Sequence, residues 1–232
     1  CYIFLILHYK WKHKFWSKEP VSSHYYIQLS EGIISNKIHD YIELNRDFKI
    51  DEYENISTIL DFKDFLNSNY YQDKKYKYKY SDKQLQFLFC NKFNTKILNI
   101  RDNKKLIGSI TSKIYKISVK NKIINLAYID FLCIDNDYRN LKLAPILISN
   151  IRYKNNLDSI ISFIFKIENN KLPFNYISKL NYYQLNLNNI TEINKYEKIE
   201  FKLMEKKDCQ KTYIFFNNKI KKYDVYPIYS YI

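Results

Sequence analysis

The clearest pattern of apolar and polar positions in this chain lies in residues 128–154. Residues 128–134 read YIDFLCI, a nearly continuous run of apolar and β-preferring side chains that is typical of a strand buried on both faces. The next four residues, DNDY at 135–138, favour a turn because Asn and Asp bond their own backbone. The pattern therefore predicts that a buried strand ends at residue 134 and that the chain leaves the sheet there.

The residues after this turn follow a helical period. Apolar side chains recur on one face of residues 141–154, which predicts a helix. This arrangement is a strand, a short polar turn and then a helix. The first turn of the helix has unpaired backbone N–H groups, and the helix dipole favours an anion beside them. Arg139 and Lys142 flank the turn. The segment is therefore a candidate anion site.

An alternation of apolar and polar residues upstream predicts an antiparallel meander that leads into the same strand. Its expected strands are 97–100, 105–119 and 123–134, with turns at Asp102-Asn103 and Lys120-Asn121. After the helix we expect a strand at 159–167 and a last pair of strands at 199–204 and 212–216.

Two further segments have a helical pattern, residues 51–67 and 83–89. Pro20 disfavours a helix at the residue before it, so residues 13–21 are expected to be extended. The remaining stretches are expected to be loops at 22–50 and 168–178, a Tyr-rich loop or exposed strand at 70–80, and an uncertain leader at 1–12.

The composition fits a globular protein with one large domain or two small ones. The 232 residues are 46% apolar, which is enough for a core. Two Gly and four Pro beside abundant Lys, Asn, Ile and Tyr suggest a coding bias, so the net charge of +14 carries little functional information. A basic chain still attracts polyanions, and the KKYKYKY stretch at 74–80 leaves a nucleic-acid-binding protein open as an alternative.

Cysteine and histidine usage indicates neither disulfides nor a metal site. The four cysteines show no CxxC pairing and the four histidines have no ligand spacing. A reducing, cytoplasmic location is the natural interpretation. The apolar residues 2–7 are too few to span a bilayer, so no transmembrane segment is expected. Cys133 lies within a buried strand, where thiols are usually inert.

The central segment also resembles a known family. Residues 130–148, DFLCIDNDYRNLKLAPILI, are similar to a segment of protein N-myristoyltransferases, also called glycylpeptide N-tetradecanoyltransferases. Three other stretches look like family motifs in the family's order: FWSKEPV at 15–21, YKYKYS at 76–81 and LIGSI at 106–110. The resemblance covers most of residues 13–190 and corresponds to the N-terminal half of the family, in a divergent form.

The resemblance implies a fold. Each half of an N-myristoyltransferase adopts the Gcn5-related acetyltransferase fold, an α+β fold with a mixed, mainly antiparallel sheet flanked by helices. Residues 13–232 are then the N-terminal, acyl-CoA-binding domain, and the C-terminal half of the family is absent. Gly108, one of only two glycines, lies in the long strand of the meander, where its lack of a side chain predicts close approach of backbone or of the acyl chain.

The resemblance also implies a reaction and its site. The reaction is transfer of a myristoyl group from the co-substrate myristoyl-CoA to the N-terminal glycine of a protein or peptide, with no prosthetic group and no metal. By resemblance, the backbone N–H groups of Phe131 and Leu132 form the oxyanion hole, and Tyr76 and Tyr78 line the peptide groove. The residues implied to hold myristoyl-CoA are Lys14, Phe15, Trp16, Cys133, Ile134, Arg139, Asn140, Leu141, Lys142, Leu143 and Ala144.

Two departures from the family affect the expected activity. Asp130 stands where the family has Asn, and its carboxylate either opposes the developing negative charge or faces away and caps the neighbouring turn. The family's catalytic base is a carboxylate at the end of the C-terminal half, and no Ser-His-Asp set replaces it. We therefore expect the chain alone to bind myristoyl-CoA but to transfer slowly or not at all, with a second chain restoring activity. A catalytically silent acyl-CoA or peptide-binding module is the alternative.

Overall fold

The computed structural model divides the chain into two compact units. The sheet unit comprises residues 35–170 and 223–228, and the second unit comprises residues 1–34, 171–222 and 229–232. The residues whose structure is described are 2–21, 35, 38, 40–44, 48–52, 59–70, 79–89, 94–167, 172–176, 178 and 204–228.

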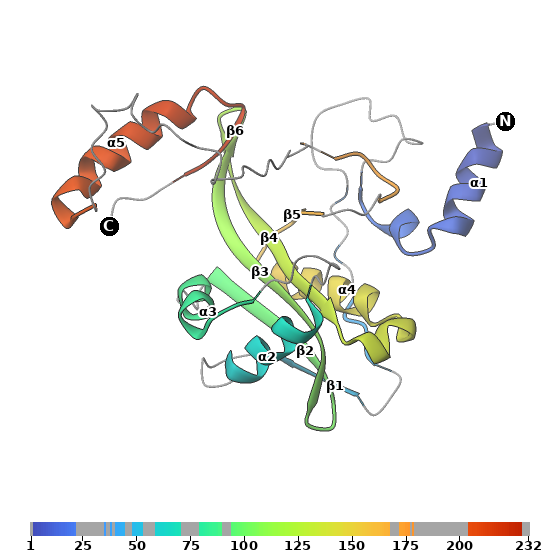
Figure 1. Cartoon of the computed structure of the whole chain (residues 1–232). Coiled ribbons are helices and arrows are strands. Elements are labelled where there is room, and N and C mark those ends of the chain that lie inside the picture. Colours follow the sequence, from blue (N-terminus) through green and yellow to red (C-terminus); the bar gives the residue numbers. More distant parts are fainter. Residues whose placement is uncertain are drawn as a thin grey trace, which may run out of the picture. The chain divides into compact units, whose positions relative to one another are not determined.

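A mixed, mainly antiparallel sheet of six strands forms the sheet unit (Figure 1). Its strands are β1 (Phe48–Glu52), β2 (Thr95–Asp102), β3 (Lys105–Val119), β4 (Lys122–Ile134), β5 (Ser162–Phe165) and β6 (Val225–Pro227). The strands β1 to β5 lie side by side in chain order, and only the pairing of β4 with β5 is parallel. β6 pairs with the end of β3. The predicted meander is therefore confirmed.

The two hairpins of the meander turn through residues with positive φ. Asn103 has φ 53°, and Lys120 and Asn121 have φ 46° and 68°. Two-residue turns of this kind match the right-handed twist of the flanking strands, and Asn adopts positive φ more readily than most residues. The second turn lies where the sequence predicts it, and the first lies one residue later than predicted, at 103–104, because Asp102 still belongs to β2.

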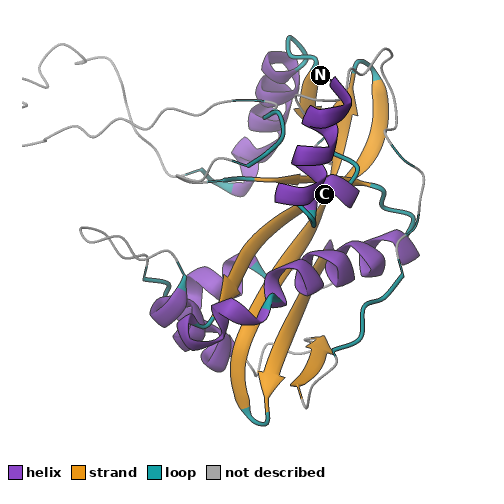
Figure 2. Cartoon of the chain, turned by 90° about the vertical axis from the view of Figure 1, so that its right-hand side faces the viewer, coloured by secondary structure: helices purple, strands orange, loops and turns teal. Residues whose placement is uncertain are grey.

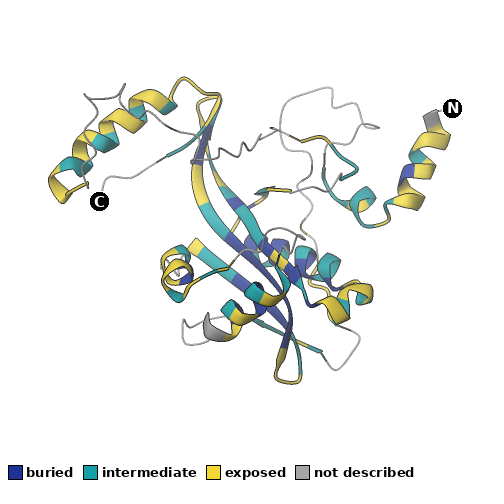
Figure 3. Cartoon of the chain, viewed as in Figure 1, coloured by how far each residue is buried: buried dark blue, intermediate teal, exposed yellow. Residues whose placement is uncertain are grey.

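Helices cover the two faces of the sheet (Figure 2). On one face, α2 (Ile59–Asn69) and α3 (Asp82–Leu88) enclose a cluster that includes Phe62, Leu85 and Phe131. On the other face, α4 (Leu143–Leu157) packs on aliphatic residues of β2 and β3. The middle of β3 and one side of α4 are the most deeply buried parts (Figure 3). The predicted helices at 83–89 and 141–154 are confirmed as α3 and α4.

The helix predicted for 51–67 is wrong in its first part. Asp51 belongs to β1, where it pairs with Asn99, and α2 begins at Ile59. The loop expected at 22–50 likewise gives way to β1 from Phe48. Arg101 on β2 donates from Nε to the Asp51 carboxylate at 2.7 Å, so a partner far away in the sequence stabilises an edge strand that local pattern does not reveal.

The prediction that 128–134 is buried on both faces is also wrong. Phe131 and Cys133 are buried, whereas Leu132 is 37% exposed and Asp130 is half-buried. The strand predicted for 159–167 is shorter than expected, because β5 spans only Ser162–Phe165 and Ser159 turns through φ 61°.

In the second unit, two predictions are corrected, and the leader, for which no element was predicted, is helical. The leader at 1–12 forms the helix α1 (Tyr2–Lys12), and the extended stretch at 13–21 contains the 3-10 turn η1 (Trp16–Lys18), although Glu19 before Pro20 is extended. The strand predicted for 212–216 is instead part of the helix α5 (Cys209–Ile220), which follows the 3-10 turn η7 (Lys206–Asp208). Of the strand predicted for 199–204, residues 199–203 lie outside the described part and Met204 is in no strand.

Candidate active site

The end of β4 carries a β-bulge. Ser109 on β3 pairs with Cys133 and Thr111 pairs with Asp130, so Phe131 and Leu132 together face the single residue between them on β3. Phe131 has φ 50°, which places an aromatic residue in the left-handed region. A bulge interrupts the regular ladder and re-aims the backbone. The two residues expected to supply the oxyanion hole are therefore the two residues of the bulge.

Aromatic rings hold Phe131 in this conformation. Its ring centroid lies 6.2 Å from that of Phe62, 5.5 Å from Tyr70, 5.4 Å from Tyr80 and 5.7 Å from Phe89. A non-glycine residue at positive φ costs on the order of 1–3 kcal/mol, and each aromatic pair contributes about 0.5–1.5 kcal/mol. The four rings therefore offset the backbone strain at the bulge.

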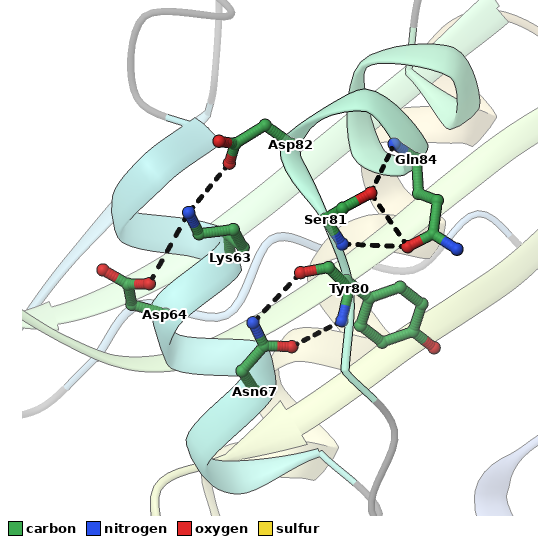
Figure 4. Close-up of polar contacts among 7 residues, drawn as sticks. All are labelled: Lys63, Asp64, Asn67, Tyr80, Ser81, Asp82 and Gln84. Carbon is green, nitrogen blue, oxygen red and sulfur yellow. Dashed lines mark hydrogen bonds and ion pairs between the residues drawn. The ribbon is translucent and has the colours of Figure 1, made fainter.

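A polar junction between α2 and α3 fixes one of these rings (Figure 4). The Asn67 side chain donates to the Tyr80 carbonyl at 3.1 Å and accepts from the Tyr80 N–H at 2.7 Å. Ser81 and Gln84 then form a capping box that begins α3. Asn67 thus acts at a distance on the bulge, because it sets the backbone from which the Tyr80 ring reaches Phe131.

Asp130 contacts the bulge itself. Its Oδ1 accepts from the Phe131 N–H at 2.8 Å and from the Tyr70 hydroxyl at 3.3 Å, and its carbonyl accepts from the Thr111 hydroxyl at 3.1 Å. The carboxylate therefore does not face away to cap a turn. It bonds one of the two N–H groups expected to stabilise an oxyanion.

The turn after β4 is anchored to the hairpin that joins β2 and β3. Asp135 accepts from the Asp137 N–H at 3.0 Å and begins the 3-10 turn η4 (Asn136–Leu141). Lys105 forms an ion pair with Asp135 at 3.0 Å, and this hydrogen bond raises the pKa of Lys105. The Tyr138 hydroxyl donates to Asp102 at 2.8 Å. These contacts hold the turn beside the end of β4.

The start of α4 has no side chain that caps its first backbone donors, among the described residues. Lys142 has φ 57° and ψ 33°, and α4 begins at the next residue without a side-chain cap among the described residues. Leu143 and Ala144 therefore present first-turn N–H groups, while Pro145 has none to offer. This geometry fits the anion site predicted from the sequence.

The side chain of Arg139 bonds protein carbonyls. Its guanidinium donates to the Ile134 carbonyl at 3.4 Å and to the Asn69 carbonyl at 3.3 Å. Asn69 is the last residue of α2, so Arg139 ties the end of that helix to the end of β4. Asn140 is exposed on the same turn.

Cys133 is not a nucleophile in this site. The side chain is buried, and this burial raises the pKa of the thiol to about 12. A thiol with this pKa is almost wholly protonated at neutral pH, so it is a poor nucleophile and a poor base.

The other expected site residues lie elsewhere or outside the described part. Lys14, Phe15 and Trp16 belong to the second unit, where the Trp16 ring lies 4.9 Å from that of Phe15 and 5.0 Å from that of Phe174. Tyr76 and Tyr78 fall outside the described residues. Within the described ranges, no group of three or more His, Cys, Asp or Glu side chains is arranged to hold a metal ion.

Sequence reasoning missed Asn67, Tyr70 and Tyr80 as contributors to the site. Tyr70 follows the end of α2, and the Tyr80 ring reaches the bulge from a point fifty residues earlier in the sequence. The one available signal was Asp130, because a carboxylate beside two backbone donors needs partners of its own.

Four features together define the acyl-CoA N-acyltransferase fold expected from the sequence. They are an antiparallel meander, a bulge at the end of its last strand, a helix start without a side-chain cap among the described residues, and a parallel β5. The family described as "Myristoyl-CoA:protein N-myristoyltransferase, N-terminal domain" matches residues 33–178. The chain belongs to this family.

Relatives and solved structures agree with this assignment. A putative glycylpeptide N-tetradecanoyltransferase of Amsacta moorei entomopoxvirus is 30% identical over 177 residues, which is 75% of this chain and 55% of that protein. The glycylpeptide N-tetradecanoyltransferase of Dictyostelium discoideum is 27% identical over 64% of this chain and 39% of its own length. The chain thus spans about half, or less, of the length of these relatives.

The fold of Saccharomyces cerevisiae N-myristoyltransferase, solved with bound myristoyl-CoA, matches 94% of this chain and 57% of that one with a TM-score of 0.77 and 19% identity. This likeness concerns the fold. Within the described part of the chain, no helix has the length and apolarity that a membrane crossing requires.

Proposed function

We propose that this chain binds myristoyl-CoA and transfers the myristoyl group to the N-terminal glycine of a protein or peptide. The observation that carries the proposal is the bulge at the end of β4, where Phe131 has φ 50°, followed by the uncapped start of α4. These two features supply a pair of backbone donors for an oxyanion and a separate set for a pyrophosphate.

In this proposal the N–H groups of Phe131 and Leu132 stabilise the oxyanion that forms when an amine attacks the thioester carbon. Removing one such donor typically costs about 10²–10³ in kcat. The backbone from Arg139 to Ala144 binds the pyrophosphate, and Cys133 and Ile134 line the adjoining pantetheine path. Lys14, Phe15 and Trp16 contact the adenine and phosphate end, and Tyr76 and Tyr78 contact the peptide.

The transfer by this chain is expected to be weak or partner-dependent. The relatives that the chain matches are longer, since it spans 55% and 39% of two of them. A second chain that adds contacts to the peptide should lower the KM for the peptide, in a cytoplasmic setting where myristoyl-CoA and new N-terminal glycines meet.

Ligand-induced stabilisation tests the proposal. A ligand that binds the native state adds about 2.7 kcal/mol to the free energy of unfolding when its concentration is one hundred times its Kd. The melting temperature rises as a result. Myristoyl-CoA should therefore raise the Tm of the 232-residue chain, and free coenzyme A should do so less. No shift with saturating myristoyl-CoA contradicts the proposal.

A matched pair of variants locates the binding. Asn140→Asp adds a negative charge to η4 beside the proposed pyrophosphate, whereas Asn121→Asp makes the same change in the exposed β3–β4 turn. At low salt we expect about a tenfold loss of myristoyl-CoA affinity for the first, because a like charge nearby opposes the phosphates. The second variant should bind as the original chain does.

A further inference from the structure

The Asp130 carboxylate bonds one of the two backbone donors proposed to stabilise the oxyanion. Donors of an oxyanion hole lie about 2.7–3.1 Å from the position of the oxyanion. Asp130 Oδ1 lies 2.8 Å from the Phe131 nitrogen, so the carboxylate oxygen accepts from one of the two N–H groups proposed for the oxyanion. A thioester oxygen that accepts from the Phe131 N–H must replace the carboxylate oxygen there. The carboxylate stays near the reacting carbon, because Asp130 is the residue directly before Phe131.

The surroundings of Asp130 keep it close by. The Tyr70 hydroxyl donates to the same oxygen, and the Thr111 hydroxyl donates to the Asp130 carbonyl. Tyr115 on β3 also faces this charge, since its pKa is raised first by burial and then by Asp130. Lys113 on β3 donates instead to the Leu88 carbonyl of α3.

Other titratable side chains near the bulge are poor candidates for a base. The Cys133 thiol is protonated at neutral pH because burial raises its pKa to about 12. Asp135 is engaged with Lys105 and caps η4. The described residues of the sheet unit include no histidine. Asp130 is thus the described carboxylate that lies directly beside the proposed oxyanion donors.

We propose that Asp130 is the general base that accepts the proton of the substrate's N-terminal ammonium. The inference rests on the proposed function and names a catalytic group for it within this chain. In the first step the ammonium gives one proton to the carboxylate, leaving a neutral amine and a carboxylic acid.

In the second step the amine nitrogen forms a bond to the thioester carbon, and the carbon–sulfur bond breaks. Of the two hydrogens left on the nitrogen, one stays in the amide and the other passes as a proton to the coenzyme A sulfur, so the products are the amide and the free thiol. The carboxylic acid then returns its proton to water. No oxidant, metal or further reactant is required.

Two physical arguments favour this order of events. A carboxylate that loses a hydrogen-bond donor becomes a stronger base, so displacement of Asp130 from the Phe131 N–H by the thioester oxygen increases its basicity when the acyl group is in place. Once protonated, the group is neutral. It then no longer repels the negative charge that develops on the thioester oxygen.

The test compares Asp130→Asn with Asp64→Asn. Asn has nearly the same shape as Asp and its oxygen still accepts the Phe131 N–H, but it cannot accept a proton. Asp64 is an exposed carboxylate on α2 and provides the same chemical change away from the bulge. The measurement is single-turnover transfer from myristoyl-CoA to a Gly-initiated peptide at pH 6.5 and at pH 9, together with the Tm shift caused by myristoyl-CoA.

At pH 6.5 we expect Asp130→Asn to lower the transfer rate about 100-fold, in the range that a positioned general base contributes. At pH 9 the gap should narrow to less than about tenfold, because an α-amino group of pKa about 7.7–8.0 is then already neutral. Asp64→Asn should transfer as the original chain does. All three chains should show the same Tm shift.

The outcomes separate this inference from the proposed function. If Asp130→Asn transfers as fast as the original chain or faster at pH 6.5, the carboxylate is only an obstacle to the oxyanion hole and the inference is wrong. A chain that binds myristoyl-CoA but transfers no faster than buffer at either pH also overturns it, while binding stands. Absence of the Tm shift in the original chain contradicts the proposed function itself.

Discussion

The two faces of the sheet differ in how their buried Asn and Ser side chains are hydrogen-bonded. On the α4 face, the Asn150 side chain bonds both the N–H and the carbonyl of Ile42 at 2.8 Å, and Asn155 accepts from the Ser112 hydroxyl at 2.9 Å. On the α2 face, Asn99 and Ser109 are cross-strand partners that are fully buried, yet their side chains have no hydrogen-bond partner among the described residues.

This difference separates a face built for stability from one built around a site. Satisfied amides on the α4 face fix a helix whose start forms the candidate anion site. The α2 face holds the bulge, an aromatic cluster, and two polar side chains whose burial without partners costs about 1–3 kcal/mol each. Departures from good packing of this kind are typical of functional regions.

The largest effect should come from the aromatic cluster. Phe131→Ala removes a ring that four other rings contact, and large-to-small changes of buried Phe cost about 3–5 kcal/mol of unfolding free energy. Phe87→Ala on α3 is the matched control, since Phe87 is 77% exposed. Urea unfolding measures both, and equal small losses would show that the bulge does not depend on its rings.

On the α4 face, Asn155→Leu should cost about 2 kcal/mol. Leu has the same branching of heavy atoms, but the Ser112 hydroxyl loses its acceptor and stays buried. Asn125→Leu, an exposed change on β4, should stay within about 0.5 kcal/mol of the original chain. Tolerance of Asn155→Leu would mean that the α4 face does not rely on satisfied amides.

Gly108→Val tests how tightly the α4 face is packed. A Cβ at Gly108 meets Ile134 Cδ1 at 3.0 Å and Leu147 Cδ1 at 3.4 Å, so the neighbours are core side chains rather than space for a ligand. Overpacking of this kind costs typically 1–3 kcal/mol, here about 1.5, so we expect a larger effect on stability than on myristoyl-CoA affinity. Loss of affinity at unchanged stability would restore the sequence-based expectation that an acyl chain approaches this glycine.

The smallest expected effect is an increase, rather than a loss, of the free energy of unfolding. Asn99→Leu replaces an unpartnered amide with an apolar group of the same branching, so we expect it to raise the unfolding free energy by about 1 kcal/mol. Ser109→Ala should act in the same direction by less. A clear loss of stability in both variants would indicate that these side chains have polar partners in solution, such as buried water.

Sequence reasoning located the meander, its two turns and the strand–turn–helix segment because each follows from local periodicity. It failed for β1 and α5, where nearby residues mislead: Asp51 looks like the start of a helix, and the aromatic run in 212–216 looks like a strand. Burial of β4 was also overestimated, since composition alone cannot show that a bulge brings Leu132 to the surface.

For the candidate site, the backbone groups could be placed by resemblance, but the side chains around them could not. The partners of Asp130 come from α2 and β3, and the ring cluster joins residues from Phe62 to Phe131. Such contacts depend on how helices pack on the sheet. They could not be derived from spacing along the chain.

Some paired strands are neighbours in the sequence and others are far apart, and this difference affects folding kinetics. β3 and β4 join through a two-residue turn, whereas β6 reaches β3 from about a hundred residues away. Closing a short loop costs little entropy, so we expect the hairpin that carries the bulge to form in the folding transition state and β6 to dock afterwards. A destabilising change in β6, such as Tyr226→Ala, should then speed unfolding and leave the folding rate nearly unchanged.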